Sequence, residues 1–361
     1  MPPHAGTDRS EPKAICLTFW LHGHNNPSYE ALFSRLGSVV FFRKVTFSRW
    51  RAIQALQYRL WARSSYRLIY PLAFRYLSRR YSTLFTVDPW QIPLWNRKVI
   101  LDMNDPTYDP AVLTLLKQPQ VEAIVVSTER VKRTLVDLGV VAPVHVIPQI
   151  VPVHLDADEI REVRSRYRSD GEVVAGYPAP TLSLSRDGPR RWRRGVDDLD
   201  LLFAAAEEAR KVEPRLRLWL LGEPSPSVRQ FARARSWVRL FGYVPRARLF
   251  AYIANFDIGL YPRTTILPAG SFSVKIVQYM ACGLPVVSTL VEESLPVQEA
   301  GCGIICHSKS EFAKALIELA QSSELRTRLG LKGKAPVKIH TDWSHLPVYE
   351  ALIRDVVHQS A

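Results

Sequence analysis

Short apolar runs recur along this sequence, and most of them are separated by stretches with a helical or polar pattern. The runs are residues 13–21, 39–42, 84–87, 99–101, 123–126 and 144–147, followed by residues 172–175, 216–221, 238–241, 257–261, 286–287 and 303–306. Uninterrupted apolar runs of this length are typical of strands that are buried on both faces of a parallel sheet. Their alternation with helical stretches predicts an α/β fold with parallel sheets and crossover helices.

Helical periodicity fills most of the intervals between these runs. The helices expected from it are residues 50–70, 196–211, 246–255, 310–320, 325–331 and 343–357. The alternation restarts near Val151, and 361 residues are more than one ordinary core requires. We therefore predict an N-terminal domain of residues 1–150, a C-terminal domain of residues 151–338 and a closing helical segment at 339–361.

The segment from Ile266 to Glu293 combines a loop, a helix and a strand within about one βαβ unit. A Pro/Gly/Ser loop at 268–271 leads into a helix that ends before Gly283, a residue that tolerates a left-handed cap. The apolar residues of that helix are Phe272, Ile276, Tyr279 and Met280. A small-residue loop at a helix N-terminus can bind an anion through unsatisfied N–H groups. An ordinary crossover with a glycine cap has the same pattern, and the residues alone favour that interpretation.

Basic residues outnumber acidic ones, with a formal net charge of +14 and a pI near 9.8, which implies an anionic partner or surface. The bias is strongest between Ala31 and Val87, where no acidic residue occurs and aromatic residues are interleaved with basic ones. The basic residues of this face are Arg35, Arg43, Lys44, Arg49, Arg51, Arg59, Arg63, Arg67, Arg75, Arg79 and Arg80.

Three explanations of this face differ in the partner that they imply. Basic side chains beside Trp and Tyr suit an anionic membrane surface, where each Lys or Arg contributes about 1 kcal/mol. A solvated arginine face explains the composition nearly as well. A single-stranded nucleic-acid groove is also basic and aromatic, but no recognisable binding motif accompanies the residues, so we expect no nucleic-acid partner.

The remaining composition bounds the compartment and the chemistry. The four cysteines are too few and too scattered for a disulfide framework, and their spacing does not fit a zinc site. The N-terminus lacks a signal-peptide pattern, and no apolar run approaches the roughly 20 residues of a membrane span. We expect a cytoplasmic protein without a metal site, attached peripherally at the inner face of the membrane if its basic face binds lipid.

Several motifs resemble those of one enzyme family. They are KIVQYMACGLPVVST at 275–289, ILDMNDP at 100–106, STERVKRTLVDLG at 127–139 and VHVIPQIVP at 144–152. The sequence resembles the retaining GT-B glycosyltransferases of the family 4, or group 1, type over nearly its full length, and least over 31–81. The resemblance implies two Rossmann-like domains that face each other across a cleft, the second binding the nucleotide sugar and the first the acceptor. It also implies a final helix that crosses back to the N-terminal domain.

The resemblance further implies a reaction. A sugar moves with retention from an NDP-sugar, which is a co-substrate, to a membrane-associated or lipid-linked glycan acceptor, and no metal or other cofactor is needed. Such transfer requires no protein nucleophile, but the leaving diphosphate must be stabilised by cationic side chains and helix N-terminal amides.

Ten candidate site residues follow from the family motifs. The donor-binding set is Gly23, Arg186, Arg194, Val244, Gly270, Ser271, Phe272, Lys275 and Gln278, and the candidate at the catalytic position is Asn104. In this resemblance Arg194, directly before Gly195, takes the place of the family's phosphate-binding cation, and Arg186 replaces a second one. Lys275 matches a lysine of one family variant, and Gln278 is expected near the ribose.

Two departures from the family pattern leave a second hypothesis open. The family's paired glutamates fall on Gly270 and Gln278, neither of which is acidic. The usual histidine of the N-terminal domain falls on Asn104, which can orient a hydroxyl but cannot shuttle a proton; His22 and His24 are alternatives for that role. The second hypothesis is a catalytically degenerate GT-B protein that acts as a membrane- or partner-binding accessory subunit.

Overall fold

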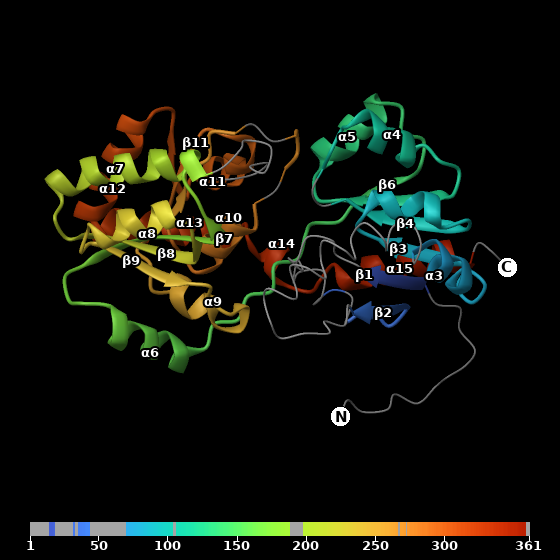
Figure 1. Ribbon diagram of the computed structural model, residues 1–361, viewed down its shortest axis with the longest axis horizontal. Helices are drawn as coiled ribbons and strands as arrows, with labels where there is room; N and C mark the ends of the chain where they lie inside the picture. The colour runs from blue at the N-terminus through green and yellow to red at the C-terminus, as the bar shows by residue number, and fades with distance from the viewer. Residues whose placement is uncertain are drawn as a thin grey trace. The chain divides into compact units, whose positions relative to one another are not determined.

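The computed structural model contains two six-stranded parallel sheets (Figure 1). It describes residues 14–18, 32, 35–43, 70–103, 106–187, 198–265, 268–271 and 273–358. The chain divides into two compact units. Unit 1 is Met1–Ile150, Pro268–Gly270 and Trp343–Ala361, and unit 2 is Val151–Leu267 and Ser271–Asp342. The α/β fold expected from the apolar runs is therefore confirmed.

Unit 1 contains a sheet with the strand order β2-β1-β3-β4-β5-β6. The strands are β1 (Ala14–Thr18), β2 (Val39–Arg43), β3 (Thr83–Thr86), β4 (Lys98–Asp102), β5 (Val121–Val126) and β6 (Val144–Val146). The helices are α3 (Tyr70–Leu77), η2 (Pro89–Leu94), α4 (Pro110–Leu116), α5 (Glu129–Asp137) and α15 (Leu346–His358).

Both faces of this first sheet are covered. On β4, Val99 and Leu101 pack with α4 and α5, whereas Ile100 between them packs with α15 on the other face. Polar bonds fix α15 in place, because the Tyr349 hydroxyl donates to buried Asp102 at 3.0 Å and Lys98 Nζ donates to the carbonyl of Val356 at 3.0 Å. The closing segment of the chain thus completes the core of unit 1.

Unit 2 contains a sheet with the order β12-β11-β10-β7-β8-β9. The strands are β7 (Val173–Leu182), β8 (Leu216–Pro224), β9 (Val238–Gly242), β10 (Ile258–Tyr261), β11 (Val286–Thr289) and β12 (Gly303–Cys306). The helices are α6 (Ala157–Tyr167), η3 (Ser185–Asp187), α7 (Leu199–Val212), α8 (Pro226–Arg233), α9 (Arg246–Ile253), α10 (Val274–Ala281), η5 (Glu292–Ser294), α11 (Leu295–Ala300), α12 (Lys309–Gln321), α13 (Ser323–Lys334) and α14 (Lys338–Thr341).

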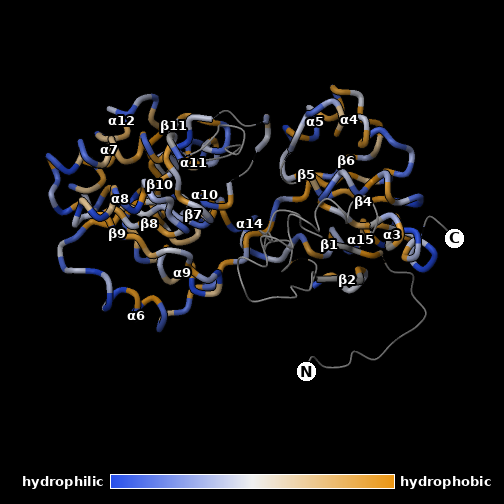
Figure 2. The backbone as a smooth tube through the Cα atoms, viewed as in Figure 1, coloured by the Kyte–Doolittle hydropathy of each residue, from blue (hydrophilic) through white to orange (hydrophobic). Residues whose placement is uncertain are grey.

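The second sheet is also buried on both faces, as its uninterrupted apolar runs predict. Along β8, Leu218 and Leu220 pack beneath α7, α8 and α12, and Trp219 and Leu221 pack beneath α6, α9 and α10. Figure 2 shows hydrophobic residues along the central strands, and hydrophilic residues that alternate with hydrophobic ones on the outer helices. This strand order with helices on both faces is that of a Rossmann-like domain.

Some predicted boundaries were wrong. The strand expected at 172–175 continues to Leu182, because its register shifts between Pro178 and Thr181 and so accommodates prolines that cannot donate to the ladder. The helix expected to include Phe272 begins at Val274 instead, with Ser273 as its N-cap residue. The helix expected at 50–70 lies outside the described residues, apart from Tyr70 at the start of α3.

Within the described part of the chain, none of the helices combines the length and the apolar character that crossing a membrane requires.

Gly259 provides a test of the packing of unit 2. A Cβ atom at this position would lie 2.4 Å from the ring of Tyr279, so Gly259→Ala is expected to lower the free energy of unfolding by about 1–3 kcal/mol. At Gly37 the nearest heavy atom to such a Cβ lies 3.9 Å away, so Gly37→Ala should change stability by less than about 0.5 kcal/mol. Urea unfolding measures both variants, and equal midpoints would contradict the assigned packing.

Candidate functional site

The topology of unit 2 identifies one edge of its sheet as the candidate site. The chain builds β7, β8 and β9 in one direction and then returns to place β10 on the other side of β7. Ligands of open α/β sheets bind outside the carboxyl ends of the strands at such a reversal of strand order. The candidate site therefore lies beyond the carboxyl ends of β7 and β10.

Two glycines allow aromatic side chains to pack directly on these two strands. Gly176 of β7 pairs with Gly259 of β10, and Cβ atoms there would meet the ring of Phe256 at 2.1 Å and the ring of Tyr279 at 2.4 Å. The hydroxyl of buried Tyr279 donates to the carbonyl of Leu260 at 2.9 Å. Helix α10, which carries Tyr279, is thus fixed against the reversal point.

Helix α10 places two predicted donor-binding residues together. Lys275 and Gln278 are three residues apart and therefore neighbours on the helix surface; Lys275 is half-buried, and Gln278 is buried. The Lys275 ammonium lies 5.5 Å from the ring centroid of Tyr177 and 5.8 Å from that of Tyr261. Both distances fall within the range of cation–π attraction, so two tyrosines hold this cation at the edge of the site.

A buried ion pair lies beside Tyr261, and the sequence interpretation missed it. Arg263 Nε lies 3.5 Å from Oε1 of Glu293, whose side chain is 0% exposed. The same carboxylate oxygen accepts a hydrogen bond of 3.3 Å from the Tyr261 hydroxyl. Arg263 follows the end of β10 by two residues, but its partner Glu293 follows a different strand, so the sequence gives no signal for the pair.

The loop after β10 is also bonded to the start of α7. The backbone N–H of Asp198 donates to the carbonyl of Pro262, and the Thr264 hydroxyl donates to Asp198 Oδ2 at 3.0 Å. Asp198 is the N-cap of α7, because its Oδ1 accepts from the N–H of Leu201 at 2.8 Å. The loop that precedes Asp198 carries the predicted cation Arg194 and lies outside the described residues.

Gly270 belongs to unit 1 and cannot carry a side chain in this conformation. Its φ is +84°, and a Cβ atom would lie 2.3 Å from Val131 Cγ2, which is in the same unit. Nearby, the Tyr108 hydroxyl donates to the carbonyl of Ala269 at 2.5 Å. A glutamate at position 270 would therefore require this loop to adopt another backbone conformation.

The other predicted residues are only partly described. Half-buried Ser271 lies between the loop at 268–270 and α10, and half-buried Val244 follows β9. Gly23, Asn104 and Phe272 lie outside the described residues, as does the side chain of Arg186. The roles assigned to all ten candidate residues stay predictions.

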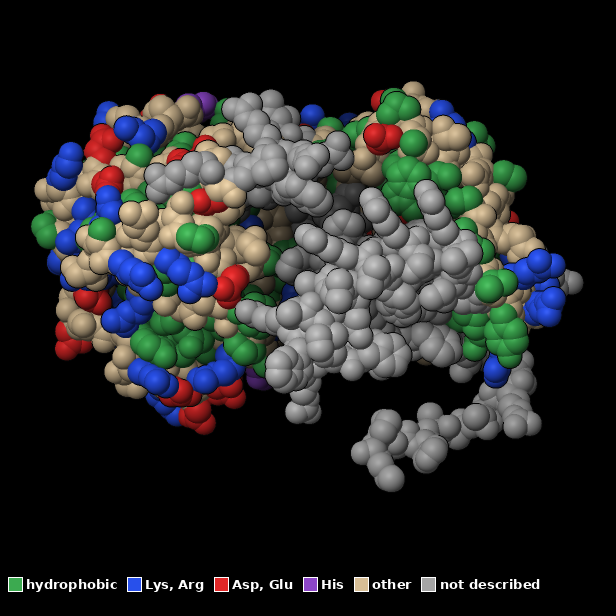
Figure 3. All heavy atoms as spheres, viewed as in Figure 1, with side chains coloured by type: hydrophobic (Ala, Val, Ile, Leu, Met, Phe, Trp, Pro, Cys, Tyr) green, Lys and Arg blue, Asp and Glu red, His purple; other side chains and the backbone are tan. Residues whose placement is uncertain are grey.

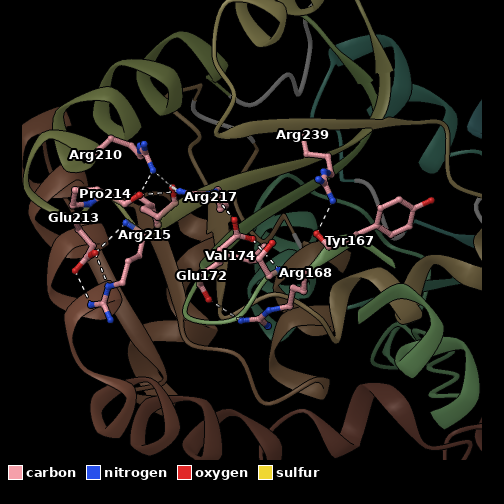
Figure 4. Close-up of polar contacts among 12 residues, drawn as sticks. Tyr167, Arg168, Glu172, Val174, Arg210, Glu213, Pro214, Arg215, Arg217 and Arg239 are labelled. Carbon is pink, nitrogen blue, oxygen red and sulfur yellow. Dashed lines mark hydrogen bonds and ion pairs between the residues drawn. The ribbon is translucent and has the colours of Figure 1, made fainter. Parts of the chain in front are cut away.

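Most other ion pairs of unit 2 lie away from this edge. At the amino ends of β7 and β8, Arg168 bonds Asp257 at 2.5 Å and Arg217 bonds Glu172 at 2.7 Å; Figure 4 shows these arginines among the surrounding polar contacts. Asp257 also accepts from the N–H of Val174 at 2.7 Å. These cations are balanced by nearby carboxylates, so their role is to hold strand and helix ends together.

Two Asp-x-Asp motifs of unit 2 lie at helix starts. The sequence contains Asp-x-Asp at 156–158 and at 198–200, and Asp156 and Asp198 are the N-caps of α6 and α7. Among the described residues, no group of three His, Cys, Asp or Glu side chains is arranged to hold a metal ion.

Burial raises the pKa of the Cys282 thiol, at the end of α10, to about 12, so this thiol is protonated at neutral pH.

Residues 190–322 match the family model of glycosyl transferases group 1. The match extends from the loop before α7 to the end of α12 and includes Lys275, Gln278 and the Arg263–Glu293 pair.

Over this segment the chain is similar to the group 1 glycosyl transferases.

Solved structures confirm the fold of the chain. Anabaena HepE, solved in complex with UDP-glucose, has a TM-score of 0.68 and 13% identity, and the match covers 97% of this chain and all of HepE. WaaG, described as a glycosyltransferase involved in lipopolysaccharide biosynthesis, has a TM-score of 0.60 and 12% identity over 95% of this chain and 99% of WaaG. These matches establish the GT-B fold with two Rossmann-like domains, as its sequence motifs predict.

A third solved structure matches the chain less completely. S. aureus TarM, solved in complex with UDP, has a TM-score of 0.56 and 14% identity, and the match covers 76% of this chain and 55% of TarM. A search of curated protein sequences found no match to the chain.

Asp198 provides a test of the junction between α7 and the loop after β10. Asp198→Ala removes the helix cap and the partner of Thr264, so we expect the free energy of unfolding to fall by about 1–2 kcal/mol. Asp198→Asn is the matched control, because an amide also caps a helix and bonds a hydroxyl. Urea unfolding should rank the alanine variant well below the asparagine variant; equal stability of the two would contradict the junction.

Proposed function

We propose that this glycosyltransferase transfers a sugar, with retention and without a metal ion, from an NDP-sugar to a membrane-associated or lipid-linked glycan acceptor. The observation that carries the proposal is the placement of Lys275 by Tyr177 and Tyr261 at the carboxyl edge of the matched domain. Complexes of HepE and TarM with UDP or UDP-glucose support the choice of a nucleotide-sugar donor.

Lys275 supplies what the leaving group needs. Departure of a nucleoside diphosphate develops negative charge, and a preorganised cation stabilises that charge without reorganising at the moment of reaction. Arg194, in the loop before α7, is the second proposed cation. With both in place the diphosphate leaves without a metal ion, the acceptor hydroxyl attacks from the same face of the sugar, and the hydroxyl proton passes to the departing diphosphate.

Gln278 takes the place of an acidic residue at the ribose. Its side-chain amide offers an acceptor and two donors, so it can bond a ribose hydroxyl in either direction. Because the amide is uncharged, it does not repel the nearby diphosphate. The nucleotide contact is therefore retained at this position although the carboxylate is absent.

A thermal-shift panel tests donor use. A nucleotide sugar present at about 100 times its Kd should stabilise the protein by about 2.7 kcal/mol and raise its Tm. UDP-glucose, UDP and GDP are the first probes. Arg194→Ala should abolish the shift and Lys275→Met should reduce it, whereas Lys338→Met, which changes an exposed lysine of α14, should leave it intact.

A second candidate function is favoured by Gly270. The described backbone conformation excludes any side chain at this position, so it also excludes the carboxylate that the family has there. The protein would then be a catalytically degenerate GT-B subunit that binds a membrane or a partner. Donor-dependent stabilisation without turnover or hydrolysis of any nucleotide sugar would support this function over transfer.

Helix α3 of unit 1 supports a membrane-associated acceptor. On α3, Leu72, Arg75 and Tyr76 lie at three- and four-residue steps and are exposed, with Leu72 71% and Tyr76 70% exposed, and exposed Arg79 follows in the turn after the helix. The opposite face is fixed, because buried Phe74 packs edge-on against Trp95. Figure 3 shows basic and hydrophobic side chains side by side at this end of unit 1. Alternating cationic and apolar side chains suit an anionic lipid interface, where long basic side chains reach the headgroups.

Vesicle binding tests this face. Replacing Arg75, Arg79 and Arg80 by Gln should remove about 3 kcal/mol of attraction to vesicles containing phosphatidylserine, a loss of roughly a hundredfold in binding. The matched control replaces Arg328, Lys332 and Lys338, exposed basic residues of unit 2, by Gln. Sedimentation with vesicles should separate the two triple variants; equal binding of both would place the membrane contact elsewhere or exclude it.

A further inference from the structure

Arg263 and Glu293 form a buried ion pair, and removing two charged groups from water costs free energy. Their side chains are 6% and 0% exposed, and Arg263 Nε lies 3.5 Å from Glu293 Oε1. Replacing such a pair by apolar residues is often neutral or stabilising, so burial of two charges is weak support for a purely structural role. The pair lies beside Lys275, the cation proposed to meet the diphosphate.

One chain of contacts joins the pair to Lys275. Glu293 Oε1 accepts from the Tyr261 hydroxyl at 3.3 Å, and the Tyr261 ring centroid lies 5.8 Å from the Lys275 ammonium and 5.5 Å from the guanidinium of Arg263. Tyr261 is 2% exposed, so its ring is fixed by packing at one end and by the carboxylate at the other. The carboxylate thereby sets the position of a ring that Lys275 contacts.

The backbone of Arg263 is fixed as firmly as its side chain. Its N–H donates to Thr289 Oγ1 at 2.9 Å, and the Thr289 hydroxyl in turn donates to the Arg263 carbonyl. Thr289 ends β11, and Glu293 follows in η5. The loop after β10 is therefore bonded to the end of β11 by both backbone and side chain.

Charge balance explains why the arginine accompanies the glutamate. A carboxylate alone at this edge would repel a diphosphate, and in a low-dielectric site that repulsion would be strong. Arg263 offsets the charge of Glu293, so that the carboxylate does not repel an anion held near Lys275.

We infer that Arg263 and Glu293 are positioning residues for the phosphates of the donor, acting through Tyr261 on Lys275. The inference rests on the proposed use of a nucleoside diphosphate sugar. Glu293 orients the Tyr261 ring, and the ring holds the Lys275 ammonium. Arg263 neutralises the charge of the Glu293 carboxylate.

Binding of UDP and of uridine by calorimetry tests the inference, with GDP and guanosine as a second set of probes. Glu293→Gln should weaken UDP binding about tenfold, the equivalent of about 1.4 kcal/mol, and leave uridine binding unchanged. Lys275→Met should weaken UDP binding at least as much. The double variant with Glu293→Gln and Lys275→Met should be no weaker than Lys275→Met alone, because both changes remove the same interaction.

Arg263 requires variants that fold. Arg263→Met alone leaves a buried carboxylate without its guanidinium, so Arg263→Met with Glu293→Gln provides the neutral form of the pair. This double variant should bind UDP about tenfold more weakly than the unmodified protein, and Arg263→Met alone more weakly still.

The control is a pair at the opposite edge of the same sheet. Arg168→Met with Asp257→Asn removes a partly buried ion pair at the amino ends of the strands (Figure 4). This double variant should lower the Tm without changing the ratio of uridine to UDP affinity, which is the result expected when a pair with a purely structural role is removed.

Unchanged UDP binding in the Glu293→Gln and Arg263→Met/Glu293→Gln variants, with normal binding by the unmodified protein, overturns the inference alone. Failure of the unmodified protein to bind UDP or GDP overturns the proposed donor and the inference together.

Discussion

The candidate site depends on the close approach of aromatic rings to two strands. Gly176 and Gly259, paired across β7 and β10, leave room for the rings of Phe256 and Tyr279 directly on the backbone. Tyr279 then bonds the carbonyl of Leu260 and fixes the helix that carries Lys275 and Gln278. A side chain at Gly259 would displace that helix and, with it, the residues proposed to hold the donor, whereas a side chain at Gly176 would displace Phe256.

Around this contact the second unit separates two kinds of charged group. At the amino ends of its strands, ion pairs such as Arg168–Asp257 hold chain ends together and are balanced locally. At the carboxyl ends, Arg263 is balanced by Glu293, while Lys275 lies against tyrosine rings. Because aromatic rings attract a cation, this arrangement fixes the Lys275 ammonium at the edge where an anionic ligand would bind.

The sequence predicts the fold better than the site, for physical reasons. Strands buried on both faces leave continuous apolar runs, so consecutive residues of a strand carry the same signal, and the family motif at 275–289 identifies α10 directly. The Arg263–Glu293 pair leaves no such signal, because each residue alone resembles an ordinary polar loop residue. The contact between Arg263 and Glu293 depends on the order of strands in the sheet.

The predicted end of β7 was wrong because the prolines of this strand argue against a strand in the sequence. Only the register shift in the structure accommodates them.

Helix α15 has a consequence for synthesis of the protein. It covers one face of the first sheet, with Tyr349 and Ile353 buried against residues such as Phe85 and Ile100. Domains generally fold as units during translation, beginning with the N-terminal one. Here the unit that starts the chain lacks one side of its core until residues 346–358 leave the ribosome, whereas every strand of the second unit has emerged by then. The first unit to be synthesised is thus the last to be completed, and its exposed apolar face must be kept from aggregation throughout synthesis of the second.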